Sequence, residues 1–210
     1  MNQAAAYEKI YERISSLVDD ENANVEVPTC PGWTVKDVVA HLAGFFAVYE
    51  EQGLKGFGPG WGDKVVEERA DRSLSECLEE WAERFRGAAE ISPVAISDTL
   101  AHEEDIRTAI GEPGAQDDPN FVPSVEMALA FLTKSGDDKP TFRVKTDDVD
   151  QTIGDNEPVA TLRTSTFELF RALQGRRTKE QVRAMDWEGD PSPVLNHFFI
   201  FGPTKEVVET

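Results

Sequence analysis

The chain has 210 residues, a length that suits one large domain or two small ones. Apolar residues make up 40% of it, enough for a packed core, which argues against a disordered chain. Its 40 acidic and 21 basic residues give a net charge of −19, and such a surface repels phosphate groups. We therefore expect no role in binding nucleic acid or an anionic membrane surface.

No stretch of the sequence is typical of an exported or membrane-spanning protein. The first residues, MNQAAAYEKIYERISSL, carry charges every few positions and have no apolar signal core. No apolar run reaches the ~18 residues that a transmembrane helix needs. Two cysteines, Cys30 and Cys77, are too few for a disulfide framework in a chain of this size. We expect a cytoplasmic protein.

Apolar residues at helical spacing dominate the first 135 positions. Thr34 and Ser73 are suitable N-caps, because each is followed three residues later by an acidic residue. The glycine-rich segment at 53–63 is expected to be a flexible loop, and its Trp61 could fold over a pocket. It lacks the GK[ST] ending of a phosphate-binding loop. Helices are expected over residues 4–18, 35–51, 73–90, 92–110 and 124–133. Several helices joined by modest connections favour a bundle.

The character of the chain changes at the polar segment SGDDKP, residues 135–140. Alternating residues at 142–149 and 159–163, separated by the turn sequence GDNEP, predict a β-hairpin. Two short helices are expected at 165–174 and 178–185. We therefore expect a mainly α protein with a small α+β part, divided into a helical domain at 1–137 and a small α+β domain at 138–210.

Two of the three histidines fall within predicted helices. His41 lies in the apolar pattern WTVKDVVAHLAG, and Asp98 and His102 are four residues apart in DTLAHEEDIRTAIG. Residues at this spacing share one face of a helix, so a carboxylate and an imidazole there can hold the same ion, with a second imidazole from a facing helix. Alternatively, the histidines are hydrogen-bonded core residues and Asp98 is a surface carboxylate.

Two segments carry a resemblance to a known family. VPTCPGWTVKDVVAHLAG at 27–44 and DTLAHEEDIRTAIG at 98–111 resemble, in this order, the two signatures of the mycothiol-dependent maleylpyruvate isomerase family. The segment TFELFRALQGRRTKEQVRAMDWEGDP is similar to that family's C-terminal part. The resemblance implies a four-helix bundle of the DinB type, followed by a small α+β domain. It also implies metal ligands at His41, Asp98 and His102, although the family's pattern has Glu in place of Asp98.

The family's chemistry would follow from such a site. A divalent ion with open positions deprotonates a bound thiol, and the thiolate then attacks an electrophile. The resemblance implies mycothiol as co-substrate. The mixed nitrogen and oxygen donors suit zinc first and nickel or iron next, and we expect a monomer or homodimer. The reaction would be isomerisation or S-transfer to a small electrophile, as in detoxification; catalytic residues stay unassigned. Alternatives are a non-catalytic metal- or ligand-binding module of the same fold, and a bundle that has lost its metal.

Four further residues near these motifs are candidates for a role at the site. Trp33 is a packing anchor at the start of its helix or a substrate platform. Asp105 is placed to orient an imidazole that binds the metal. Arg107 either contacts substrate or forms an ion pair with a neighbouring carboxylate. Cys30 is a candidate nucleophile by residue type only, since a catalytic cysteine needs a base, and the resemblance places it in a structural turn.

Overall fold

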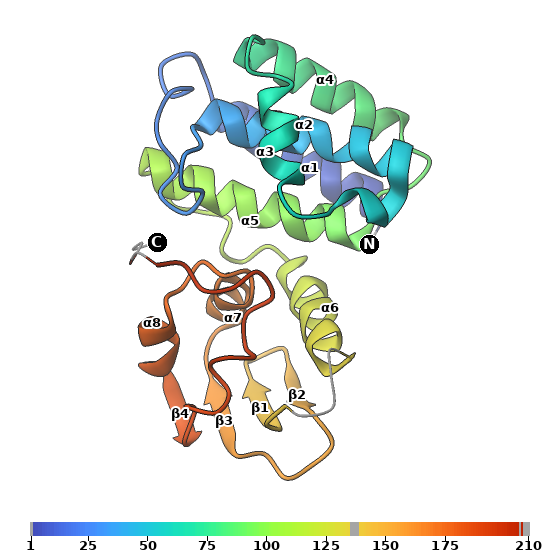
Figure 1. Ribbon diagram of the computed structural model, residues 1–210. Coiled ribbons are helices and arrows are strands. Elements are labelled where there is room, and N and C mark those ends of the chain that lie inside the picture. The colour runs from blue at the N-terminus through green and yellow to red at the C-terminus, as the bar shows by residue number, and fades with distance from the viewer. Residues whose placement is uncertain (1, 135–138, 206, 208–210) are drawn as a thin grey trace. The chain divides into compact units, whose positions relative to one another are not determined.

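The chain forms two compact units in a computed structural model that describes residues 2–134, 139–205 and 207. The first unit spans Met1–Gly114 and the second Ala115–Glu209 (Figure 1). The boundary expected between residues 137 and 138 lies outside the described residues. The division by compactness falls earlier, so the helix expected at 124–133 belongs to the second unit.

The first unit is entirely helical. Its elements are α1 (Gln3–Leu17), α2 (Val35–Gln52), the short 3-10 helix η1 (Gly53–Gly56), α3 (Trp61–Glu67), α4 (Leu74–Gly87) and α5 (Pro93–Ile110). The four long helices α1, α2, α4 and α5 make the bundle: α2 packs against α4 and α5, and α1 packs against α5 (Figure 1). The predicted four-helix bundle is confirmed.

Side-chain caps set where the long helices begin. At the start of α2, Thr34 accepts a hydrogen bond from the backbone N–H of Asp37, and the Asp37 carboxylate accepts one from the N–H of Thr34. Ser73 makes the same reciprocal capping box at α4, and Ser92 caps α5. The caps satisfy backbone N–H groups that have no partner within a helix. They fix the starting points of the two helices, α2 and α5, that carry the candidate site.

The glycine-rich segment is more ordered than a flexible loop. It contains η1, and α3 begins at Trp61, inside the residues expected to be a loop. Gly60, the N-cap of α3, has φ of 76°, a left-handed conformation that glycine adopts at little cost. Glycine content therefore predicted a loop where glycine provides the turn into a short helix, which lies beside α2.

A buried hydrogen-bond cluster ties three helices of the bundle together. The Tyr7 hydroxyl of α1 accepts a hydrogen bond from the indole N–H of Trp81 in α4, at 2.9 Å. The Thr99 hydroxyl of α5 lies 2.9 Å from the same Tyr7 oxygen. Burial raises the pKa of Tyr7 well above its ordinary value. Burial keeps this hydroxyl neutral, and the hydrogen bonds hold it in place among the rings of Phe46, Trp81 and Phe85.

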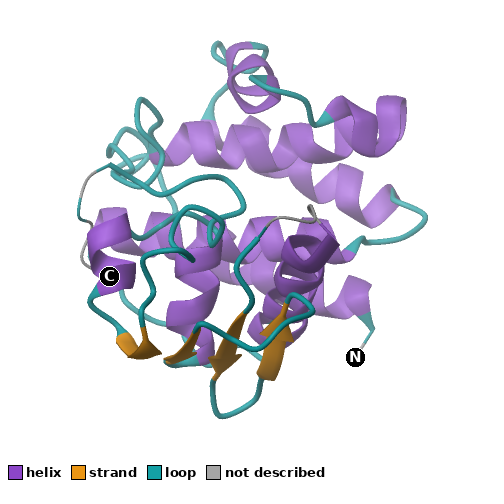
Figure 2. Cartoon of the chain, turned by 60° about the horizontal axis from the view of Figure 1, so that its bottom comes forward, coloured by secondary structure: helices purple, strands orange, loops and turns teal. Residues whose placement is uncertain are grey.

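The second unit combines helices with one four-stranded sheet. Its elements are α6 (Phe121–Lys134), β1 (Phe142–Lys145), β2 (Asp150–Ile153), β3 (Ala160–Arg163), α7 (Thr166–Leu173), α8 (Lys179–Arg183) and β4 (Asp186–Gly189). The strands have the order β2-β1-β3-β4 (Figure 1), and Figure 2 draws them in orange. The predicted small α+β part is confirmed. Its two short helices are present, capped by Ser165 and Thr178.

The strand pairing differs from the predicted hairpin. The expected partners β1 and β3 are adjacent but parallel, and the antiparallel partner of β1 is β2. A tight turn at Thr146 causes the difference, because its hydroxyl accepts hydrogen bonds from the backbone N–H groups of Asp148 and Val149. The chain therefore reverses eight residues earlier than the GDNEP turn. β4, which lacks an alternating apolar pattern, pairs antiparallel with β3.

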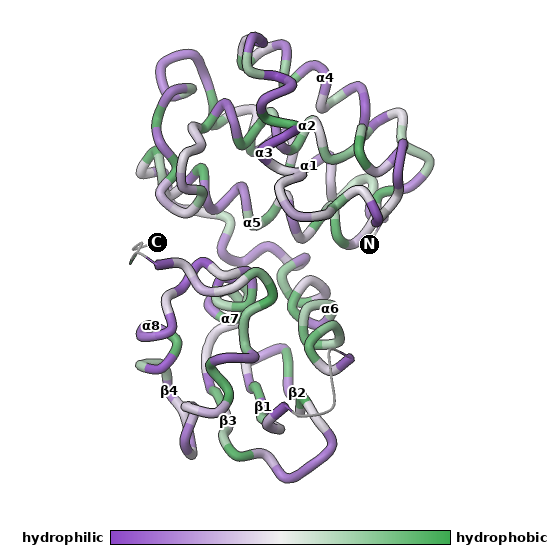
Figure 3. The backbone as a smooth tube through the Cα atoms, in the orientation of Figure 1, coloured by the Kyte–Doolittle hydropathy of each residue, from purple (hydrophilic) through white to green (hydrophobic). Residues whose placement is uncertain are grey.

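Hydropathy and burial coincide more closely in α6 than in α5. In Figure 3 much of the tube of α6 is green, and α6 packs against α7 and β2. The tube of α5 alternates between purple and green, because this helix carries buried acidic residues and histidine among its apolar ones. Within the described parts of the chain, no helix combines the length and apolar character needed to cross a membrane.

Candidate metal centre

Three side chains predicted as ligands come together inside the first unit. His41 lies in the middle of α2, and Asp98 and His102 lie one turn apart on α5. One Asp98 oxygen is 3.4 Å from His41 Nε2, and the other is 3.7 Å from His102 Nε2. Both imidazoles are buried, whereas the Asp98 side chain is 25% exposed. The carboxylate thus lies between the two rings and is accessible from outside.

These donor atoms are spaced as ligands of one ion would be. Each residue offers one atom, and the three atoms lie within 4.8 Å of one another. Two atoms bound to a single zinc ion at about 2.0–2.2 Å are roughly 3.3–3.6 Å apart in a tetrahedral arrangement. The distances of 3.4 and 3.7 Å from Asp98 to the two imidazoles are close to this value. Two imidazoles and a carboxylate suit zinc, nickel or iron(II).

The other nitrogen of His102 faces a buried carboxylate. Asp105 Oδ2 is 3.1 Å from His102 Nδ1, and the Asp105 side chain is fully buried. Burial by itself lowers the pKa of His102, but the hydrogen bond with Asp105 and the charge of Asp98 outweigh it and raise that pKa to about 10. Asp105 therefore favours a proton on Nδ1, which leaves Nε2 directed toward Asp98.

A cysteine also lies near Nδ1 of His102, on the same side as Asp105. Cys30 Sγ donates to Asp105 Oδ2 at 3.5 Å and lies 3.8 Å from His102 Nδ1. Cys30 is partly exposed and is a free thiol. The turn that carries it is fixed by its own backbone, because the N–H of Cys30 donates to Val27 and its carbonyl accepts from Trp33. The thiol is therefore held next to the imidazole.

Two tryptophans enclose His41. The ring centroids of Trp33 and Trp61 are 5.0 and 4.5 Å from that of His41. The indole N–H of Trp33 donates to Asp63 of α3 at 3.1 Å. Helix α3 also approaches His41 through Gly62, where an added Cβ would lie 3.3 Å from His41 Nδ1. The first turn of α3 therefore covers the side of His41 that faces away from Asp98.

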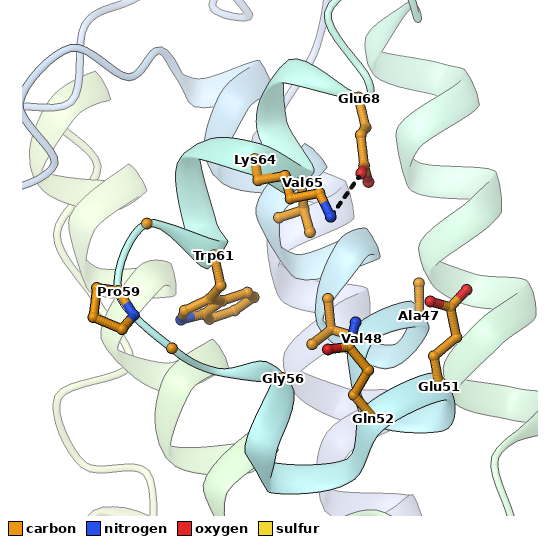
Figure 4. Close-up of a pocket in the computed structure, with 12 residues that line it drawn as sticks. Ala47, Val48, Glu51, Gln52, Gly56, Pro59, Trp61, Lys64, Val65 and Glu68 are labelled. Atoms are coloured by element: carbon orange, nitrogen blue, oxygen red, sulfur yellow. Dashed lines mark ion pairs between the residues drawn. The ribbon is translucent and has the colours of Figure 1, made fainter.

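Trp61 also lines a cavity of about 290 Å³ between α2, η1 and α3 (Figure 4). Its walls include the side chains of Glu51 and Gln52 and an ion pair of 3.8 Å between Lys64 and Glu68. Figure 4 shows the indole next to Pro59, and the ion pair in the next turns of α3. Because Trp61 contacts both the cavity and His41, it is the residue that links the two.

Arg107 is engaged elsewhere. Its guanidinium is 2.9 Å from a Glu103 carboxylate oxygen and donates to the carbonyl of Glu112 at 3.2 Å. Arg13 of α1 binds the same Glu103 carboxylate, at 2.6 and 2.8 Å. Of the two interpretations offered for Arg107, the structure has the ion pair with a neighbouring carboxylate.

Two contacts of the site were not predicted from the sequence. Cys30 is 72 positions from His102 in sequence, and its residue type alone had made it a candidate nucleophile. The available signal was its position eleven residues before His41, in the turn that leads into α2. Gly62 gave no signal, since its close approach to His41 is purely three-dimensional.

Comparison with known proteins gives a family match and two structural matches. Residues 5–93 match the model of the mycothiol maleylpyruvate isomerase N-terminal domain. Two crystal structures of the mycothiol-dependent maleylpyruvate isomerase, the first of a histidine-to-alanine mutant, are similar, with TM-scores of 0.58 and 0.53 and identities of 14% and 13%. Each match covers 83% of this chain and 88% of the other. The sequence matches no curated protein.

The family match covers only part of the candidate site. The matched family segment contains His41, Trp33 and Cys30, and it ends at the first residue of α5. Asp98 and His102 lie beyond it. At 13–14% identity the structural matches show the fold, which is the DinB-like fold of the isomerase. The ligand set of this chain must therefore be judged on its own geometry.

Proposed function

We propose a metal-dependent enzyme that uses mycothiol, on the basis of the match of residues 5–93 to the mycothiol maleylpyruvate isomerase N-terminal domain. The thiol attacks a small electrophile, and the outcome is isomerisation or S-transfer. We place the enzyme in the cytoplasm, as a monomer or homodimer. Its two cysteines are free thiols, which suits a reducing compartment.

One observation carries the proposal: the carboxylate of Asp98 lies between two buried imidazoles, 3.4 Å from His41 and 3.7 Å from His102. This donor set fits zinc first and nickel or iron(II) next. When bound, such an ion supplies a positive charge that lowers the pKa of a coordinated thiol and so provides a nucleophile at neutral pH. The partial exposure of Asp98 gives the thiol access from the same side.

The chain's own residues hold and enclose this site. Asp105 accepts the Nδ1 proton of His102, which keeps Nε2 available to a ligand. Trp33 and Trp61 pack against His41 and exclude water from that ring. Low water content strengthens the electrostatic effect of a bound charge. Asp98 is one methylene shorter than the Glu of the family pattern, so its carboxylate stays closer to the α5 backbone.

The proposed reaction needs no further cofactor. The thiolate adds to a conjugated carbon–carbon double bond, and the resulting single bond rotates. Departure of the thiolate restores the double bond in the other geometry, which regenerates the thiol. If the electrophile instead carries a leaving group, the sulfur displaces it and the thiol is consumed. The two outcomes differ in whether mycothiol is recovered.

The test is an activity assay on the tag-free, full-length chain, loaded with zinc, nickel or iron(II) in turn. We expect maleylpyruvate or another small electrophile to be converted only when both metal and mycothiol are present. Asp98→Ala should remove this activity. Asp147→Asn, which changes an exposed carboxylate in the turn before β2, is the matched control and should leave it unchanged.

Two results would overturn the proposal. If the protein holds metal but never couples it to thiol chemistry, the non-catalytic binding module is the better interpretation. If metal is bound equally by the parent and by Asp98→Ala and His41→Ala, these residues are not ligands.

A further inference from the structure

The face of His102 that looks away from Asp98 has its own set of three donor atoms. Cys30 Sγ, His102 Nδ1 and Asp105 Oδ2 lie within 4.8 Å of one another. The sulfur is 3.8 Å from the nitrogen and 3.5 Å from the oxygen, and the nitrogen and oxygen are 3.1 Å apart. His102 and Asp105 are buried, while Cys30 is partly exposed.

These separations fit a metal ion that takes one sulfur ligand. Bonds of about 2.3 Å to sulfur and 2.0–2.2 Å to nitrogen and oxygen place tetrahedral ligands roughly 3.3–3.6 Å apart. The three atoms need to move by only a few tenths of an ångström to reach such positions. The turn around Cys30 is already fixed by backbone hydrogen bonds to Val27 and Trp33, so the thiol is pre-positioned.

We propose that Cys30, His102 and Asp105 form a second metal position, selective for strongly thiophilic divalent ions such as cadmium. The sulfur ligand is the source of the selectivity, because soft ions prefer thiolate to carboxylate or imidazole. The partial exposure of Cys30 is the route by which an ion enters. This position takes no direct part in the proposed reaction, but it shares the imidazole of His102 with the His41–Asp98–His102 position, so its effect on that position rests on the proposed function.

The two positions exclude each other. A neutral imidazole has one unprotonated nitrogen, so it can ligate through Nε2 or through Nδ1 but not through both. An ion at the Cys30 position therefore moves the ring proton from Nδ1 to Nε2, where it blocks the Nε2 ligand of the first position. A thiophilic ion thus acts as an inhibitor of the first position.

Proton balance follows from the ligand types. Cys30 binds as a thiolate, so the S–H proton is released to solvent when the ion binds. The proton of a neutral His102 stays on the ring and changes nitrogen. Where His102 starts out protonated on both nitrogens, a second proton is released. Asp105 is a carboxylate both before and after the ion binds. Its oxygen loses the hydrogen bonds from Cys30 and His102 and binds the ion instead.

The experiment is a titration of the tag-free, full-length chain with cadmium alone, followed by the near-ultraviolet absorption of the cadmium–thiolate bond. We expect one cadmium ion per chain and a clear band in the parent. Cys30→Ser should lose the band and weaken cadmium binding by at least ~10-fold, the lower limit seen when a partner of a metal ligand is lost. Cys77→Ser is the matched control, because Cys77 is buried in α4 and is the other cysteine of the chain.

His41→Ala separates this proposal from the proposed function. The Cys30 position does not use His41, so this variant should keep the cadmium band while losing ions that prefer nitrogen and oxygen ligands. Loss of the cadmium band in His41→Ala would show that the Cys30 position depends on His41, which contradicts the proposal. Two cadmium ions per parent chain would show that the two positions do not exclude each other.

Alkylation of the unmodified protein gives a test that needs no variant. Iodoacetamide should label Cys30 more slowly once cadmium is bound, with labelling located by mass spectrometry. An unchanged rate at Cys30 with one cadmium bound would show that the ion lies elsewhere.

Discussion

Two neighbouring residues of α5 lie in very different polar clusters. Glu103 is bound by the guanidinium groups of Arg13 and Arg107, so its buried charge is compensated within the bundle. His102, one position earlier, lies between the carboxylates of Asp98 and Asp105. One step along a helix turns a side chain by ~100°, so the two residues point to different sides. Burial of charge alone therefore does not mark a functional site; the partner type does.

The cluster on α4 follows the pattern of Glu103. Glu80 binds Arg69, Arg72 and Arg84 at 2.7–2.9 Å. Burial alone would raise its pKa, but hydrogen bonds and charge from these arginines lower it to about 2. Two arginine–carboxylate networks thus hold the bundle together, whereas the His102 cluster offers nitrogen, oxygen and sulfur donors to a metal.

The clearest difference between the clusters should appear in how stability depends on pH. The pKa of His102 is raised from 6.5 to about 10, so its protonation stabilises the metal-free fold fully below pH 6.5. This contribution is lost as the pH rises through 10. Glu80 behaves oppositely, because its pKa is lowered from 4.5 to about 2. Its contribution is present above pH 4.5 and is lost as the pH falls through 2.

Urea unfolding of the metal-free protein from about pH 2 to about pH 11 covers both pKa values and measures both effects. In His102→Ala the alkaline loss should disappear, and in Glu80→Gln the acid loss should shrink. An alkaline loss that persists unchanged in His102→Ala would mean that another group causes it.

Removal of Glu103 should cost stability and leave metal binding alone. Glu103→Ala leaves Arg13 and Arg107 without their shared carboxylate, and breaking a buried ion pair costs about 3–5 kcal/mol of unfolding free energy. The number of metal ions per folded chain should stay the same. Glu112→Ala, at an exposed position just after α5, is the control and should change neither quantity. If the Glu103 variant folds normally but loses metal, the Glu103 cluster takes part in metal binding and the two clusters are not separate.

Asp105→Asn tests the opposite case, a change within the His102 cluster. We expect metal affinity at the His41–Asp98–His102 position to fall by ~10–100-fold, the usual range when the partner of a ligating histidine is lost. The amide is nearly the same size as the carboxylate, so the unfolding free energy of the loaded protein should change mainly through the weaker metal binding. Calorimetric titration with nickel measures the affinity, and an unchanged value would remove Asp105 from the site.

The smallest expected effect concerns the start of α2. Thr34→Ala removes the hydrogen bonds of the Thr34 hydroxyl with Asp37 and should lower the unfolding free energy by ~1 kcal/mol. His41 lies two turns further along, so metal affinity should hardly change. Ser73→Ala, the equivalent cap of α4, should show a similar cost, and both are measured by urea unfolding.

Local signals predicted the long helices of the chain, but not α3, which begins inside the segment expected to be a loop. Thr34, Ser73 and Ser92 are caps that act within four residues, and the structure has the helices that they start. Likewise Gly111 ends α5 in a left-handed conformation, with φ of 73°. Such features depend on neighbours in sequence, so a sequence reveals them.

Long-range features were the ones missed. The parallel pairing of β1 with β3 depends on the early turn at Thr146. From the sequence, this turn and the GDNEP turn were both plausible places for the chain to reverse. The meeting of Cys30 with His102, and the cover of His41 by Gly62, depend on how separate helices pack. The histidine spacing indicated which residues can bind metal. Only the structure gives their distances to Asp98 and to one another.

The most direct test of the metal centre is the nickel content of the tag-free protein after loading and gel filtration, measured by elemental analysis. The parent and Cys30→Ser should each hold close to one nickel ion per chain. His41→Ala and His102→Ala should hold almost none, with folding verified by circular dichroism. Equal nickel in the parent and the two histidine variants would contradict a centre built from His41, Asp98 and His102.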